Sequence, residues 1–288
     1  GLYRLMCAVV VTGVSCMMCA GAPRNVRWHN EASDTTLITE ILTDAHARKW
    51  SNPSECTGYI ARKFIGLPYV AHTLEGETEE VTVNLDELDC TTLVDVAAAL
   101  AYTVGEGRTG WQDFVYNLER MRYRGGKADG YASRLHYNCE WAMDNTHRGN
   151  VTDVTDLVGN SRYAVRSIDY MSQHRDSYPA LKDSATFERI KQVENGFRNH
   201  RFPYIRTADL GSKDVSERLR DGDIVAFVSN RKDLDVTHLG IIVKENGKVK
   251  VLHASSSHGK VEISESTLPD FVKRNRYWIG IRVYRLKQ

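Results

Sequence analysis

A cysteine at the start of an apolar segment is the first residue in this sequence that could do chemistry. Cys90 follows Asp89 and precedes an alanine-rich stretch over residues 90–102, which predicts a buried helix with the sulfur at its N-terminus. Free N–H groups and the helix dipole at that end stabilise an anion, so this placement favours a nucleophilic thiolate. A small apolar residue that begins a core helix would give the same pattern, so Cys90 alone does not decide the function.

Two histidines in the last third of the chain could supply the base that such a nucleophile needs. His238 begins an apolar run, and His253 ends the next one, across the two-residue hairpin signal Asn246-Gly247. Counting outward from this turn, Glu245 pairs with Lys248, which places His238 diagonal to His253. One imidazole can then take the thiol proton while the other fixes its tautomer.

The elements that must position these residues are helical first and extended last. Predicted helices cover residues 33–48 (capped by Ser33), 53–66, 90–102, 111–121 and 184–198, and predicted strands cover residues 223–229, 238–244, 249–254 and 277–286. Residues 67–89 read as an acidic, solvated loop, and residues 151–210 otherwise carry no assigned role. This order indicates the α+β class, in which the helix of the nucleophile packs on a C-terminal antiparallel sheet.

Composition and charge exclude several classes of protein. The chain has 288 residues, 42% of them hydrophobic, and a formal net charge of +1, which allows one large domain or two small ones. Basic stripes are absent from the sequence, so no nucleic-acid partner is expected. We predict no metal and no cofactor. Zinc held by Cys90, His238 and His253 is the alternative, but a thiol at a helix N-terminus favours a nucleophile.

The N-terminal segment differs from the rest of the sequence. Arg4 precedes an apolar run over residues 5–19 and the small residues 20–22, which is typical of a secretory signal peptide over residues 1–22. We therefore expect an exported, periplasmic protein with no stable membrane span after processing. A transmembrane anchor, or a lipid anchor on Cys16 or Cys19, are the alternatives.

Two further cysteines, Cys56 and Cys139, remain in the expected mature chain. They could pair with each other, which would leave Cys90 as the free thiol. They could also be separate buried thiols, which is common for cysteine and is the interpretation that we favour.

The motifs resemble the NlpC/P60 superfamily of papain-like peptidoglycan amidases. In order, the chain has Leu67-Pro68-Tyr69, Asp89-Cys90-Thr91-Thr92, Asp221-Gly222-Asp223, His238-Leu239-Gly240-Ile241 and His253-Ala254-Ser255. The resemblance implies Cys90 as nucleophile, His238 as base, His253 as the residue that orients it, and Tyr69 as support beside the nucleophile. The N–H of Cys90 would stabilise the oxyanion. Thr91-Thr92 replaces the usual Ser-Gly, which puts the superfamily's usual γ-D-glutamyl-diaminopimelate cleavage in doubt.

Three longer segments are similar to one branch, the DUF1460 family: GLPYVAHTLEG (residues 66–76), LDCTTLV (residues 88–94) and SRLHYNCEW (residues 133–141). The resemblance implies a single catalytic domain over residues 23–288, with family-specific insertions at about residues 103–210. It also implies hydrolysis of the N-acetylmuramoyl-L-alanine bond of peptidoglycan fragments through a thioester. The expected partners are therefore muropeptides, in particular small anhydro-muropeptides.

Residues 131–141 combine aromatic rings with hydrogen-bonding groups, as sugar-binding sites do. The predicted substrate-binding residues are Asp89, Thr91, Arg134, His136, Tyr137 and Trp141. Arg134 could bind a peptide carboxylate by a bidentate contact. A helix start with Trp141 in the core is the alternative.

Two other functions fit the same sequence. A γ-D-glutamyl-diaminopimelate endopeptidase would use the same catalytic residues, and a catalytically inactive muropeptide-binding module would keep only the cleft. The complete set of Cys90, His238 and His253 favours an enzyme.

Overall fold

The structure, a computed structural model, describes residues 25–287 of the chain. The helices are α1 (Glu31–His46), α2 (Pro53–Arg62), α3 (Cys90–Gly105), α4 (Trp111–Arg122), α5 (Asn138–His147), α6 (Thr155–Val158), α7 (Tyr170–Gln173), α8 (Ser184–Asn195), α9 (Lys213–Arg218) and α10 (Leu268–Arg274). The strands are β1 (Val26–Trp28), β2 (Val81–Val83), β3 (Val151–Asp153), β4 (Arg162–Arg166), β5 (His200–Arg206), β6 (Ile224–Ser229), β7 (Val236–Glu245), β8 (Lys248–Ser255), β9 (Lys260–Ile263) and β10 (Trp278–Leu286). The predicted signal peptide, with Cys16 and Cys19, lies outside the described residues.

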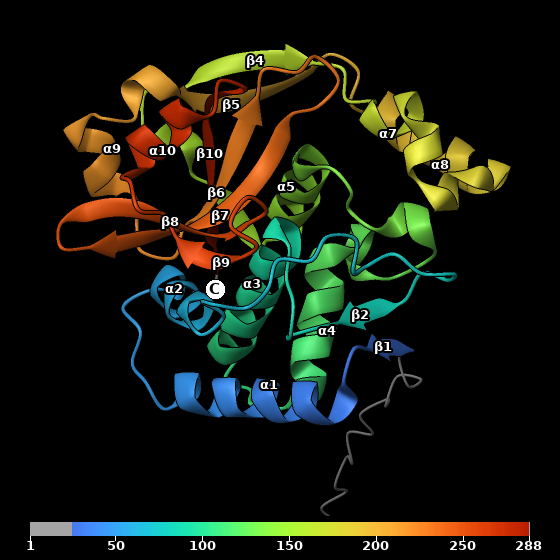
Figure 1. Cartoon of the computed structure of the whole chain (residues 1–288), viewed down its shortest axis with the longest axis horizontal. Helices are drawn as coiled ribbons and strands as arrows, with labels where there is room; N and C mark the ends of the chain where they lie inside the picture. Colours follow the sequence, from blue (N-terminus) through green and yellow to red (C-terminus); the bar gives the residue numbers. More distant parts are fainter. Residues whose placement is uncertain (1–24, 288) are drawn as a thin grey trace, which may run out of the picture.

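An eight-stranded sheet forms the second half of the fold, as the sequence predicts. Its order is β4-β5-β10-β6-β7-β8-β9, with β3 also paired to β10, and every pairing is antiparallel. Helices α1–α4 lie together beside this sheet, while α9 and α10 lie on its far side (Figure 1). The α+β class, with helices first and an antiparallel sheet last, is therefore confirmed.

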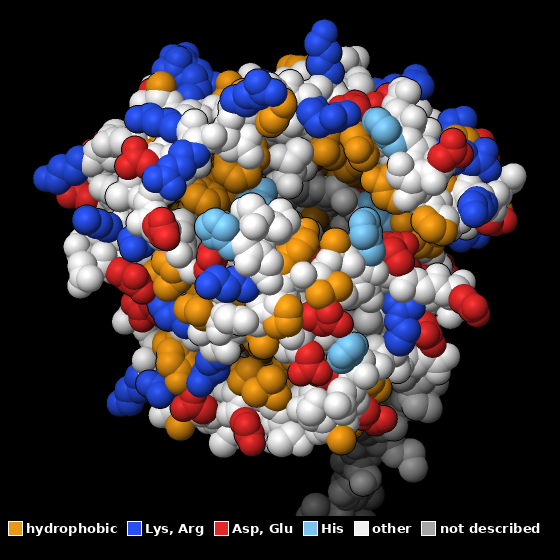
Figure 2. Space-filling view, in the orientation of Figure 1, with side chains coloured by type: hydrophobic (Ala, Val, Ile, Leu, Met, Phe, Trp, Pro, Cys, Tyr) orange, Lys and Arg blue, Asp and Glu red, His pale blue; other side chains and the backbone are white. Residues whose placement is uncertain are grey.

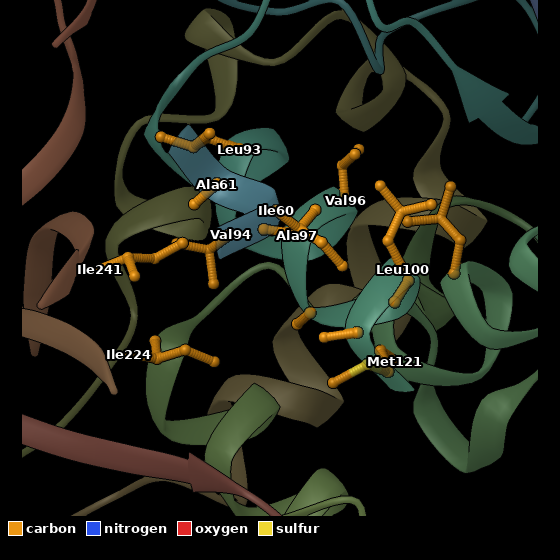
Figure 3. Packing of buried hydrophobic residues seen from close by; sticks show 14 of the residues in the cluster. Ile60, Ala61, Leu93, Val94, Val96, Ala97, Leu100, Met121, Ile224 and Ile241 are labelled. Carbon is orange, nitrogen blue, oxygen red and sulfur yellow. The ribbon is translucent and has the colours of Figure 1, made fainter. Parts of the chain in front are cut away.

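Helix α3 is the centre of the core. Most of its side chains are fully buried, and they contact α2 through Ile60, α4 through Met121 and the sheet through Ile224 and Ile241 (Figure 3). Its run of alanines lets the neighbouring helices approach closely, because small side chains leave little space between them. This packing fixes the direction of α3 and therefore the place of its first residue.

A buried ionic network ties α2 to the start of β6. Asp223, fully buried, accepts hydrogen bonds from Arg285 Nε (2.8 Å) and Nη2 (2.7 Å) and from Ser54 Oγ (3.0 Å). Gly222 precedes it with φ +85°, and a Cβ at this position would lie 1.6 Å from the Ser54 carbonyl oxygen. The Asp-Gly turn before β6 therefore packs closely against the start of α2, and only glycine fits at its second position.

The predicted hairpin is confirmed. Asn246 (φ +50°) and Gly247 (φ +74°) both adopt the left-handed conformation that a type I′ turn needs, and Glu245 pairs with Lys248. This register continues to Ile241 opposite Leu252. Because a two-residue turn fixes the register, the histidines that follow on both strands have fixed relative positions.

Several predicted boundaries differ from the structure. Asn30, and not Ser33, caps α1, since its side chain accepts a hydrogen bond from the Ser33 N–H. The segment expected to be a loop before Cys90 contains β2, which pairs in parallel with β1. Glu79 in that segment is not solvated, because its side chain is only 4% exposed and contacts Arg134.

Residues 151–210, which had no assigned role, extend the sheet and build a small third core. β4 and β5 form an antiparallel pair at one edge of the sheet. Helix α8 begins at Ser184 as predicted and buries Ile190 against Ile168, Phe197 and Tyr137. This third core therefore supports the segment that contains Tyr137.

Candidate active site

Cys90 is the first residue of α3, as predicted, and Asp89 caps that helix. Asp89 Oδ1 accepts hydrogen bonds from the N–H groups of Thr91 (3.0 Å) and Thr92 (2.8 Å), and Thr92 Oγ1 accepts one from the Asp89 N–H (2.8 Å). This capping box fixes the backbone on both sides of the cysteine. Thr92, one of the two residues that replace the superfamily's usual Ser-Gly, therefore completes the cap.

His238 and His253 form a hydrogen-bonded pair, as the hairpin register predicts. His238 Nε2 lies 3.0 Å from His253 Nδ1, and the two rings stand nearly perpendicular, at 85°. His238 Nδ1 is therefore the nitrogen that remains available for proton transfer. It can accept a proton only when the Nε2 proton of His238 is the one donated to His253.

Glu262 is a neighbour of this pair that the sequence analysis missed. It lies opposite His253 in the β8–β9 pairing, and its Oε1 is 4.0 Å from His253 Nε2. A carboxylate there favours a proton on His253 Nε2, which leaves His253 Nδ1 free to accept from His238. The same oxygen lies 2.6 Å from His258 Nδ1. The spacing of four residues between His258 and Glu262 is the sequence signal that could have indicated this contact.

Aromatic rings hold His238 in place, and the sequence analysis missed these too. The Trp278 ring stacks on the His238 ring, with 9° between their planes, and the Phe227 ring contacts both of them. Trp278 Nε1 donates a hydrogen bond to Thr237 Oγ1 (3.0 Å), while Phe271 contacts the His253 ring. These contacts restrict rotation of both imidazoles, because the rings are packed from several sides.

A cavity of about 130 Å³, here called the Cys90 cavity, is lined by both Cys90 and His238. Its lining includes Cys90, Thr91, His136, Tyr137, Trp141 and His238. One face of the molecule is hollowed near its middle, with histidine and hydrophobic side chains around the hollow (Figure 2). Six of the residues that the sequence predicts as catalytic or substrate-binding thus line one cavity.

Burial makes the resting pair neutral. Burial, and then the charge of Asp89, raise the pKa of Cys90 to about 11, although a hydrogen bond from the Leu239 backbone and contacts at the helix start act in the opposite direction. Burial and the neighbouring His253 lower the pKa of His238 to about 3. These shifts oppose the expected thiolate, because desolvation outweighs the stabilisation at the helix N-terminus.

Tyr69 lies near the nucleophile. Its N–H donates to the Gly259 carbonyl oxygen (2.9 Å), and it forms a parallel bridge with Leu88, two residues before Cys90. Burial, followed by the charges of Cys90 and Asp89, raises the pKa of Tyr69. Its hydroxyl therefore stays protonated and can donate a hydrogen bond.

His136 lines the Cys90 cavity, and one of its ring nitrogens has a fixed partner. Its Nε2 lies 2.8 Å from the Tyr131 carbonyl oxygen, which can only accept, so the proton is on Nε2 and Nδ1 is bare. Burial and Arg134 lower its pKa to about 3, which keeps the ring neutral. His136 Nδ1 can therefore accept a hydrogen bond from an N–H or O–H group of a substrate.

The other predicted substrate residues differ in what they offer. Tyr137 donates its hydroxyl proton to Glu194 Oε1 (2.7 Å), away from the cavity, so only its ring forms a wall. Trp141 is 8% exposed and belongs to the core, yet it lines the cavity, and within residues 25–287 its Nε1 has no hydrogen-bond partner. Arg134 does not line the cavity: it is 6% exposed and contacts Glu75 (2.7 Å) and Glu79 (3.2 Å).

Between residues 25 and 287, no group of His, Cys, Asp or Glu side chains is arranged to hold a metal ion. Cys56 and Cys139 are buried, and each is a free thiol. None of the helices described is long and apolar enough to cross a bilayer.

Comparisons with known proteins place the chain in a family. The AmiA-like model, described as N-acetylmuramoyl-L-alanine amidase-like, matches residues 59–281. A crystal structure of an N-acetylmuramoyl-L-alanine amidase from Bacteroides uniformis is 36% identical, with a TM-score of 0.77, and the match covers 82% of this chain and 99% of that one. A Bacteroides fragilis protein provisionally named a xylanase is also 36% identical, over 78% of this chain and 99% of that one, with a TM-score of 0.72.

A Legionella pneumophila protein of the DUF1460 family shares the fold at 20% identity, with a TM-score of 0.70 over 90% of this chain and 96% of that one. No curated protein sequence matches the chain. The family match spans most of the chain and includes Cys90, His238 and His253. The chain therefore belongs to the AmiA-like, N-acetylmuramoyl-L-alanine amidase-like family.

Proposed function

We propose that this protein is a cysteine amidase of the papain-like NlpC/P60 type that hydrolyses the N-acetylmuramoyl-L-alanine bond of peptidoglycan fragments. The observation that carries the proposal is the pairing of His238 with His253 at 3.0 Å beside a cavity that also holds Cys90. Family membership directs this acyl-transfer machinery to the muramoyl-alanine amide. Small anhydro-muropeptides are the proposed substrates.

The proposed reaction has two steps. The Cys90 sulfur attacks the lactyl carbonyl carbon while the thiol proton moves to His238 Nδ1, and the N–H of Cys90, at the start of α3, stabilises the oxyanion. The bond between the lactyl carbonyl carbon and the L-alanine nitrogen then breaks. The departing amine takes the proton from His238, and the acyl group remains on Cys90 as a thioester. Water gives a proton to His238 and attacks the thioester, which releases the sugar carboxylic acid and restores the thiol.

The resting groups of the site are neutral. With a pKa of about 3, His238 is unprotonated at neutral pH and is free to accept the thiol proton, although burial also makes it a weaker base. His253, whose pKa burial lowers to about 4, is also neutral and can accept the hydrogen bond that orients His238. Tyr69 is proposed to assist beside the sulfur, and His136 to accept a hydrogen bond from the substrate.

Glycoside hydrolysis is disfavoured, although one relative carries a xylanase name. Glycosidases generally use two carboxylates placed across the scissile bond. Asp95 lines the Cys90 cavity, but it is bound to Arg122 Nε at 2.9 Å and is 3% exposed. A carboxylate held in this way is part of the core and is poorly placed to act as an acid or a nucleophile.

The test is incubation of the purified protein with GlcNAc-anhydroMurNAc-tetrapeptide, followed by mass spectrometry. We expect wild type to release the intact disaccharide and the tetrapeptide, and Cys90→Ala to release neither. Release of a product that keeps L-Ala-D-Glu on the sugar would instead identify a γ-D-glutamyl-diaminopimelate endopeptidase. Binding without cleavage by either protein would identify a muropeptide-binding module.

We also propose that the protein acts outside the cytoplasm, in the periplasm. This proposal rests on the apolar segment over residues 1–22. Fractionation of cells that express the full chain tests it: loss of the segment and recovery in the periplasm are expected. Recovery of the uncleaved chain in the cytoplasm would overturn the proposal, and palmitate labelling at Cys16 or Cys19 would identify a lipid anchor.

A further inference from the structure

A second, larger hollow lies next to the Cys90 cavity. This hollow, here called the Arg274 groove, has a volume of about 1100 Å³, and its lining includes Arg231, Ser257, Arg274, Arg276 and Trp278. Thr237 and His238 line both the groove and the Cys90 cavity. A substrate whose scissile bond lies between Cys90 and His238 can therefore extend into the groove on the His238 side.

The groove carries an excess of positive charge. Three arginines line it, and none of its lining residues in the described part of the chain is Asp or Glu. The whole chain has 38 Lys and Arg against 37 Asp and Glu, so this local imbalance does not follow from composition. Ser255 and Ser257 add hydroxyl groups that can also donate hydrogen bonds to an anion.

The three arginines differ in how far they are already engaged. Arg231 is held by Asp233 at 2.9 and 2.8 Å, and Arg276 donates a hydrogen bond to the Tyr277 hydroxyl (2.6 Å). Arg274, the last residue of α10, is exposed and has no hydrogen-bond, ion-pair or ring partner among residues 25–287. Its guanidinium group is therefore available to a ligand.

We propose that the Arg274 groove binds the carboxylates of the peptide half of the substrate, an inference that rests on the proposed amidase function. Of the two halves joined by the muramoyl-alanine amide, the sugar half is neutral, whereas the stem peptide carries several free carboxylates. Guanidinium groups bind carboxylates by charge-assisted hydrogen bonds. The groove thus sets the orientation of the substrate, with the leaving peptide on the His238 side and the acyl group on the Cys90 side.

The experiment compares two substrates with the double variant Arg274→Gln/Arg276→Gln. One substrate is GlcNAc-anhydroMurNAc-tetrapeptide, and the other is GlcNAc-anhydroMurNAc-L-alanine methylamide, which has the same scissile bond and no carboxylate. We expect kcat/KM for the tetrapeptide to fall about tenfold, mainly through KM, and kcat/KM for the methylamide to stay unchanged. Both replaced side chains are exposed, so the fold should persist. Arg48→Gln, at an exposed arginine beyond α1, is the matched control and should leave both substrates unaffected.

Titration of the free tetrapeptide into wild type and the double variant separates this inference from the proposed function. Roughly tenfold weaker binding by the double variant would support the groove even if wild type cleaved neither substrate, a result that would refute only the amidase proposal. Equal binding of the peptide by both proteins, or an equal loss of kcat/KM on both substrates, would overturn the assignment of the groove.

Discussion

Glu262 is expected to stabilise the positive charge that the histidine pair carries during the reaction. Its Oε1 lies 4.0 Å from His253 Nε2, and its side chain is 19% exposed. When His238 accepts the Cys90 proton, the hydrogen bond to His253 polarises that ring toward the carboxylate. Glu262→Gln removes the negative charge at nearly constant volume, so it tests charge and not packing.

The magnitude follows from the distance. Two full charges 4.0 Å apart would interact by about 4 kcal/mol at an effective dielectric constant of about 20. The interaction here is weaker, because the proton is taken up by His238, one ring further away, and because His258 Nδ1 lies 2.6 Å from the same oxygen. We expect a barrier higher by about 1–2 kcal/mol, which lowers kcat roughly 5- to 30-fold and leaves KM unchanged.

The assay is the steady-state release of disaccharide from GlcNAc-anhydroMurNAc-tetrapeptide. Glu265→Gln, at an exposed position three residues further along the chain, is the control and should keep wild-type kcat. In a His253→Gln background, Glu262→Gln should cost nothing more, because the carboxylate acts through that ring. Wild-type kcat in Glu262→Gln, or the same loss in both backgrounds, would refute the reasoning.

Three further predictions concern the nucleophile and the core. Because the pKa of Cys90 is raised to about 11, its alkylation by iodoacetamide should keep accelerating above pH 8; a rate that is already constant at pH 7 would show a thiolate. Asp89→Ala should lower the free energy of unfolding by about 1 kcal/mol in urea, whereas Asp89→Asn should keep the cap and lower the thiol pKa; equal losses of stability would contradict this role. Asp223→Ala leaves the buried Arg285 without its carboxylate partner and should lower the free energy of unfolding by about 3–5 kcal/mol. Asp113→Ala, in an exposed ion pair, should lower it by at most about 1 kcal/mol. Similar losses of stability in the two variants would contradict the role of the buried ionic network.

The relative placement of His238 and His253 could be predicted because it depends on short-range geometry. A two-residue turn at Asn246-Gly247 fixes the pairing of β7 with β8, and counting residues along both strands then brings His238 next to His253. The helix N-terminus at Cys90 is equally local, since it depends on Asp89 and the residues that follow. Neither step requires knowledge of contacts between distant parts of the chain.

The partners of Arg134 could not be predicted in this way. Its side chain reaches Glu75, 59 positions earlier in the sequence, and Glu79, so the guanidinium that looked ready for a substrate carboxylate already contacts two carboxylates of the chain. The acids of that segment look like a solvated loop until the fold brings them against Arg134. Arg274 shows the reverse case, because nothing in its local sequence distinguishes it from any other exposed arginine.

Asp89 links the stability of the site to its mechanism. The same carboxylate that caps α3 and holds the backbone around Cys90 also raises the pKa of the thiol, so local order at the nucleophile comes with a weaker tendency to ionise. Burial also lowers the pKa of His238, which keeps the imidazole unprotonated and makes it a weaker base. We therefore expect proton transfer and sulfur attack to occur together in the proposed reaction. The orientation of His238 by His253, Glu262 and Trp278 should consequently control the rate more strongly than the thiol pKa does.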